Sequence, residues 1–321
     1  MLPVLFPSLR KRYNEKEIIV LFNNDLFLKQ PYNRFKEFIS AQADRYSLLL
    51  SVLDECSLPA QTLEIERKRH IVVSGSENSQ NPQSTKAGLI LTAHYDRAPQ
   101  SPGANDNGAA VFQLIDTALR MHAQQKASRT AAGANAAGTV LFIFTDGEEL
   151  SKGENLRSQG SYSLGQHLKK TGLGNSPIFT FDACGTGDTL IISTAADLLL
   201  KNESGAGAET SRRKAQTLRR IALEAARKVR LEKALLLPTP FSEDAGFLLS
   251  GMTAQTITVL PHDEAAIVRS GGTSLSKTDR RLIPETWRVL NGPGDSPLRL
   301  TPLNWKIIPA FAGALAEQIS H

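Results

Sequence analysis

Long hydrophobic runs are missing from this sequence of 321 residues, and cysteines are scarce. No apolar run approaches the roughly 20 residues that a helix needs to cross a bilayer, so we expect no membrane partner. The opening MLPVLFPSLRKR is too short for a secretory signal, and its basic residues follow its apolar patch instead of preceding it. Two cysteines, Cys56 and Cys184, make neither a disulfide framework nor a zinc ribbon. These features favour a cytoplasmic protein with buried thiols.

An excess of charge of one sign is missing as well. The chain has 37 basic and 32 acidic residues, a net charge of +5 over its whole length. The one dense basic stretch, residues 211–233, carries apolar side chains at helical spacing, with most of its Arg and Lys on the other face. It has no aromatic interleaving and no nucleic-acid motif. We interpret it as a solvated helix and expect no nucleic-acid partner.

Apolar strand patterns alternate with helical patterns along the chain. Predicted strands cover residues 88–93, 139–145, 177–183, 189–194 and 256–260, and predicted helices cover 33–55, 107–121, 161–170 and 303–319. Apolar strands separated by helices indicate a mostly parallel sheet covered on both faces. Three polar segments without periodicity, 74–86, 123–138 and 201–211, predict surface insertions. We therefore expect an α/β protein whose residues 1–321 form a single domain.

Ionisable side chains stand where several of these strands end. His94 and Asp96 follow GLILTA, Glu148 and Glu149 follow TVLFIFT, and Asp182 follows PIFTF. Ligands of such sheets bind outside the carboxyl ends of the strands. Imidazole and carboxylates are zinc ligands, and the adjacent charges of Glu148 and Glu149 would repel without a cation or proton between them. The pattern favours a metal site at this edge.

Each of these motifs has an ordinary structural interpretation when it is taken alone. His94 at a strand end is typical of a hydrogen-bonded polar residue, and DGEE is typical of a solvated acidic turn. Asp106 in GANDNGAA is equally consistent with capping the helix that follows. Only the combination favours a metal site.

Taken together, the motifs resemble a known family. TAHYD, GANDNGAA, FTDGEE with QGSYSLG, FDACGTGD and FSEDAGFLLSGM follow one another as in the co-catalytic zinc aminopeptidases, a family that also contains the glutaminyl cyclases. The resemblance covers roughly residues 36–320. It implies a three-layer α/β/α domain around a mixed, mostly parallel sheet.

The resemblance also implies a role for each site residue. His94 and Asp182 become ligands of one zinc ion, Glu149 a ligand of a second, and Asp106 the carboxylate that bridges both. Glu148 becomes the general base that takes a proton from the metal-activated water.

Two finer features follow from the same resemblance. Asp96 is expected behind His94, where it accepts the second ring N–H and fixes the tautomer. The peptide bond between Asp106 and Asn107 is expected to be cis.

The chain departs from its family at the last metal ligand. The family has a His that opens a segment of the type His-Thr-Pro-x-Asp-Thr, whereas this chain reads NGPGDS, with Asn291 in that place and Asp295 matching. An Asn carbonyl oxygen is a weaker zinc ligand than imidazole. His262, directly after the strand TITVL and Pro261, is the other candidate, although a polar His at the start of a loop is an equally open interpretation. We therefore expect one tightly bound zinc ion, with the second weak, absent or dependent on His262.

Three functions are compatible with these residues. The favoured one is a metal-dependent aminopeptidase that acts on peptides with a free N-terminus. A glutaminyl-cyclase-like acyltransferase with one metal is the second, although that group also uses the final His. The third is a non-catalytic peptide-binding descendant, for which Asn291 is the only evidence and Glu148 would have no purpose.

Overall fold

An eight-stranded sheet forms the centre of the protein in a computed structural model, which describes residues 27, 29–75, 87–129, 139–201, 204–271 and 283–319. The strands are β1 (Ala60–Ile65), β2 (Lys68–Ser74), β3 (Ala87–His94), β4 (Thr139–Thr145), β5 (Ile178–Phe181), β6 (Thr189–Ser193), β7 (Ala234–Leu237) and β8 (Ala254–Leu260). Their order is β1-β2-β4-β3-β5-β8-β6-β7. The pairs β3–β4, β3–β5, β5–β8 and β6–β7 are parallel, and the other three are antiparallel. The sheet is therefore mixed and mostly parallel, as predicted.

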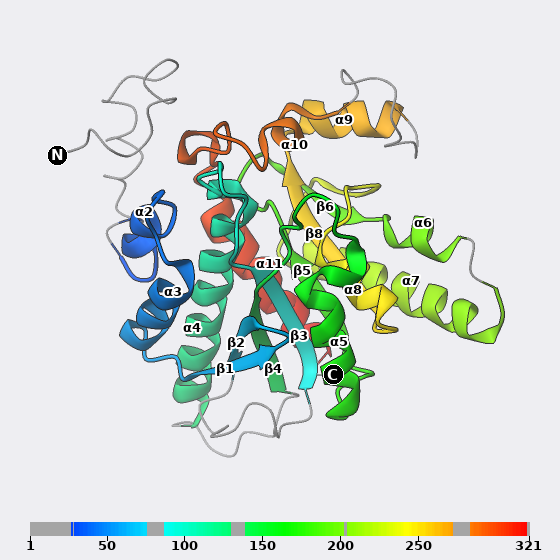
Figure 1. The fold of residues 1–321 in the computed structure, drawn as a ribbon, viewed down its shortest axis with the longest axis horizontal. Coiled ribbons are helices and arrows are strands. Elements are labelled where there is room, and N and C mark those ends of the chain that lie inside the picture. The colour runs from blue at the N-terminus through cyan, green and yellow to red at the C-terminus, as the bar shows by residue number, and fades with distance from the viewer. Residues whose placement is uncertain are drawn as a thin grey trace.

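Helices cover both faces of this sheet (Figure 1). The larger core lies under α3 (Arg45–Glu55), α4 (Ala110–Arg129), α7 (Ala206–Lys228) and α11 (Asn304–Ile319). The opposite face is covered by α5 (Gly160–Lys170) and α8 (Glu243–Leu249), and beside β6 and β7 by α9 (His262–Ser270) and α10 (Glu285–Val289). Two further short α-helices in the described residues are α2 (Phe35–Phe38) and α6 (Ala196–Leu200). This confirms the three-layer α/β/α architecture.

The predicted helix over 33–55 is wrong as a single element. It is divided into α2 and α3, and residues 39–44 between them leave the helical path. Asp44 starts the second helix because its side chain accepts a hydrogen bond from the backbone N–H of Ser47, a capping arrangement that favours a new helix at that point.

Two of the predicted insertions are partly helical. Helix α4 extends to Arg129 and so enters the segment 123–138. Helix α7 begins at Ala206 and so enters the segment 201–211. Residues 76–86, 130–138 and 202–203 lie outside the described residues. The predictions missed β1 and β2, which mix polar and apolar residues, and β7, which is apolar but only four residues long.

The expectations for the basic helix and the thiols are confirmed. Leu218, Ala222 and Ala225 of α7 are buried against the sheet, and both cysteines are free and buried. In the described part of the chain, we find no helix with the length and apolar character needed to cross a membrane.

Candidate metal centre

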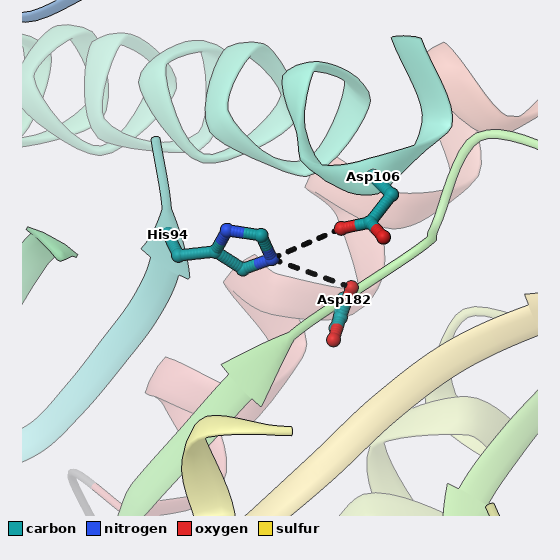
Figure 2. Close-up of side chains that lie close together, drawn as sticks. All are labelled: His94, Asp106 and Asp182. Carbon is teal, nitrogen blue, oxygen red and sulfur yellow. Dashed lines mark ion pairs between the residues drawn. The ribbon is translucent and has the colours of Figure 1, made fainter. Parts of the chain in front are cut away.

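Three potential ligands meet at the carboxyl ends of β3 and β5. His94 is the last residue of β3, Asp182 follows β5 directly, and Asp106 lies just before α4 (Figure 2). Nε2 of His94 lies 3.1 Å from Oδ1 of Asp106 and 3.8 Å from Oδ1 of Asp182. The ligand atoms all lie within 4.8 Å of one another. One imidazole nitrogen and two carboxylate oxygens at this spacing can hold a divalent ion.

The state of His94 fits such an ion. Its side chain is fully buried, and among the described residues neither ring nitrogen has a hydrogen-bond partner of acceptable geometry. Burial lowers the pKa of this imidazole, but contacts with Asp106 and Asp182 outweigh burial and raise the pKa well above its usual value. A buried ring nitrogen without a hydrogen-bond partner that faces two carboxylates is satisfied by metal ligation. The donor set therefore suits zinc.

Asp96 connects the His94 imidazole to the segment after β4. Its Oδ1 lies 3.4 Å from Nδ1 of His94, and its carboxylate accepts backbone N–H groups from Glu148 at 3.3 Å and Glu149 at 2.9 Å. Burial raises the pKa of Asp96, but His94 and these N–H donors outweigh burial and lower it. An ionised carboxylate at this position can fix the orientation of the imidazole.

Glu148 and Glu149 both have raised pKa values. Burial is the main cause for each, and the negative charge of Asp106 adds to it; the pKa of Glu149 rises to about 8. Gln159 is buried next to them, and its Nε2 donates a hydrogen bond to Oε1 of Glu148 at 3.1 Å. Glu148 therefore lies beside the ligand cluster with one of its oxygens restrained.

Asp106 is held in place through its backbone. The N–H groups of Asn105 and Asp106 donate to the two carboxylate oxygens of Asp295, at 2.8 and 3.0 Å. The bond between Asp106 and Asn107 is cis, which confirms the expectation. Asn107 also donates from its side chain to the carbonyl of Phe181, immediately before Asp182. The same short segment thus positions two of the three potential ligands.

The two candidates for the missing family ligand lie in different places. The side chain of Asn291 lies against Asp106 and Glu149. The structure does not bring His262 to the cluster. Its side chain is exposed at the start of α9, and its backbone N–H donates to the carboxylate of Asp188 at 2.9 Å. Glu149 is outside the three-ligand group found among the described residues.

Sequence reasoning did not identify three residues that support the site. Gln159 contacts Glu148, Arg45 binds the loop between His94 and Asp106, and Glu243 accepts hydrogen bonds from Thr92 and Thr145 beneath the site. Gln159 and Glu243 stand inside motifs that carry the resemblance, which is the only signal that marks them. Arg45 has no such signal, because it lies in a segment of helical pattern.

Comparisons with known proteins agree with this fold. The sequence model described as peptidase family M28 matches residues 73–244, and no curated protein sequence matches the chain. The glutaminyl cyclase of Porphyromonas gingivalis is 13% identical with a TM-score of 0.59, covering 90% of this chain and 95% of that one. LapA aminopeptidase of Legionella pneumophila is 12% identical with a TM-score of 0.59, covering 90% and 70%. These two likenesses show a shared fold.

A third solved structure differs in length. The zinc aminopeptidase BSAP from Bacillus subtilis is 20% identical with a TM-score of 0.48, and the match covers 77% of this chain but 48% of that protein. This chain therefore spans about half the length of that relative.

Proposed function

Because the chain belongs to peptidase family M28, we propose that it is a metal-dependent aminopeptidase, which hydrolyses the N-terminal peptide bond of peptides with a free amino terminus. The observation that carries the proposal is the meeting of His94, Asp106 and Asp182 beside Glu148, at the sheet edge where α/β proteins bind ligands. The proposed cofactor is zinc, since the donor set is one imidazole and two carboxylates.

A divalent ion held by His94, Asp106 and Asp182 would activate water and polarise the scissile carbonyl. Glu148 then acts as the general base: it takes the proton of the attacking water and passes it to the departing amine. Gln159 occupies Oε1 of Glu148, which leaves Oε2 to carry that proton. Asp96 keeps the imidazole of His94 in the orientation that points Nε2 at the carboxylates.

A panel of aminoacyl p-nitroanilides tests this function on the purified protein. We expect nitroaniline release that stops when a chelator removes the metal and returns when zinc is added. The matched control is the same substrate with an acetylated amine, which an aminopeptidase leaves intact. Equal cleavage of free and acetylated substrates, or no cleavage of either with zinc present, contradicts the proposal.

The second candidate is a glutaminyl-cyclase-like acyltransferase that works with one metal ion. The observation that favours it is that the metal-ligand group found in the described residues contains a single set of three ligands. A peptide that begins with glutamine separates the two functions. Release of ammonia with the peptide length unchanged indicates the acyltransferase, whereas release of free glutamine indicates the aminopeptidase.

A further inference from the structure

The backbone fixes Asn291 against the candidate metal centre. Its φ angle is 59°, in the left-handed region that Asn, Asp and His tolerate better than other side chains. Its carbonyl accepts a hydrogen bond from Nε2 of Gln100 at 2.8 Å. Four positions later, Asp295 accepts the N–H groups of Asn105 and Asp106. The segment is therefore attached at Asn291 itself and at Asp295 to the loop between His94 and Asp106.

The side-chain amide of Asn291 faces carboxylate oxygens. Hydrogen bonding is satisfied when Nδ2 points at them, because an ionised carboxylate only accepts. In that orientation Nδ2 lies 3.2 Å from Oδ2 of Asp106, and 2.5 and 3.1 Å from Oε1 and Oε2 of Glu149. The two N–H groups of one amide thus reach both carboxylates.

Two neighbouring carboxylates need a cation, a proton or hydrogen-bond donors between them. Here the neutral amide supplies donors, and it occupies the space between Glu149 and the far oxygen of Asp106. The near oxygen, Oδ1, faces His94. The two oxygens of Asp106 therefore have different partners: one belongs to the three-ligand group and the other binds the amide.

We propose that the side-chain amide of Asn291 takes the place of a second metal ion, so that this protein holds one divalent ion, on His94, Asp106 and Asp182. The inference rests on the proposed function in taking that group to bind metal. Glu149 is then not a metal ligand, and its carboxylate accepts hydrogen bonds from the amide of Asn291. One ion together with Glu148 must then supply the whole of the chemistry.

Metal stoichiometry tests the inference without any measurement of activity. The protein is equilibrated with a small excess of zinc, freed of loosely held metal by gel filtration, and analysed by native mass spectrometry and elemental analysis. We expect one zinc ion per chain. Asn291→His and Asn291→Asp are expected to bind two, because each replaces the donor with a ligand and each side chain fits a φ of 59°.

Gln100→His is the matched control. It introduces an imidazole next to the same segment but not between the two carboxylates, so it is expected to stay at one ion. Two ions in the wild type overturn the inference. One ion in the wild type and in both Asn291 variants also overturns it, because the amide then does not exclude the second ion. A wild type that binds no ion refutes the proposed function itself, whereas one bound ion without peptidase activity refutes that function and leaves the stoichiometry standing.

Discussion

Gln159 donates a hydrogen bond from its side-chain amide to Oε1 of Glu148, across 3.1 Å. Glutamine in place of Glu148 keeps an oxygen that can accept this bond, so Glu148→Gln should fold normally and bind the proposed zinc ion as the wild type does. The amide cannot take a proton from water, and removal of a general base costs at least about 100-fold in rate. We expect turnover of aminoacyl p-nitroanilides to fall by that factor or more, with zinc content unchanged by elemental analysis.

Gln159→Met is the control for this prediction. It removes the donor and keeps both the size of the side chain and the carboxylate of Glu148, so its loss of turnover should be smaller than that of Glu148→Gln. A Glu148→Gln enzyme that retains more than about a tenth of the wild-type rate would show that another group takes the proton.

Asp96→Asn tests the contact behind the imidazole. The amide keeps the size of the side chain but removes the charge that faces Nδ1 of His94 at 3.4 Å. Loss of such a carboxylate typically weakens metal binding by about 10- to 100-fold. We expect a rise of that size in the zinc dissociation constant, measured by competition with a chromophoric chelator.

Asp146→Asn provides the comparison for Asp96→Asn. Asp146 accepts the backbone N–H of Arg69, whereas the ion pairs of His94 among the described residues are with Asp96, Asp106 and Asp182. The zinc affinity of Asp146→Asn should therefore differ from that of the wild type by no more than about twofold. Equal losses in the two variants would mean that Asp96 acts through general electrostatics and not by orienting the imidazole.

The sequence predicted the parts of the site that lie at the ends of apolar strands. His94, Glu148 and Asp182 stand next to runs whose burial is plain from composition, and parallel strands bring their carboxyl ends to one edge. Contacts between distant segments were not predictable in this way. The carboxylate of Asp295 and the backbone of Asn105 are 190 positions apart, and no local pattern indicates that they bond.

The choice between His262 and Asn291 shows the same limit. His262 follows a predicted strand and Asn291 stands in the motif NGPGDS, and by residue type alone the imidazole is the better zinc ligand. The structure brings Asn291 to Asp106 and Glu149, whereas His262 begins α9 with its backbone bound to Asp188. The direction of the chain after β8 keeps His262 away from the ligand cluster. That direction depends on packing between distant segments, which one sequence does not display.

The burial of His70 should make the stability of the protein depend on pH. It is fully buried in β2, and burial, with the charge of Lys68, lowers its pKa from 6.5 to about 4. The unfolded chain therefore binds a proton between these values that the folded protein does not. Above pH 6.5 the neutral imidazole of His70 therefore does not lower the free energy of unfolding. As the pH falls from 6.5 toward 4, the free energy of unfolding decreases by about 1.4 kcal/mol per pH unit.

His70→Asn removes this titration and keeps an acceptor for the backbone N–H of Asp146. We expect the free energy of urea unfolding to fall less steeply in the variant between about pH 6.5 and about pH 4.5. The raised pKa values of carboxyl groups near the site change the pH dependence of the unfolding free energy in the opposite direction. They are present in both the wild type and His70→Asn, so they cancel when the two slopes are compared. Equal slopes would mean that His70 becomes protonated inside the folded protein.

Arg45 stabilises the loop that joins His94 to Asp106. Its buried guanidinium donates to five carbonyl oxygens, those of Phe38, Tyr95, Asp96, Pro102 and Gly103, at 2.7 to 3.3 Å. Arg45→Met leaves these acceptors buried without the donor, and each unsatisfied group costs about 1–3 kcal/mol. Because several are lost together, we expect the free energy of unfolding to fall by about 3 kcal/mol or more.

Zinc affinity should fall together with stability, because the loop sets the distance between two of the proposed ligands. Arg45→Lys should recover only part of either loss, since an ammonium group has three N–H donors and lacks the planar fork that reaches all five carbonyls. The control is Arg120→Met, which removes an exposed arginine paired with Asp116 four positions earlier and should cost no more than about 0.5 kcal/mol. Urea unfolding and chelator competition on the three variants measure both quantities. If Arg45→Met loses stability but binds zinc as tightly as the wild type, the loop holds its shape without the guanidinium, and Arg45 serves the fold alone.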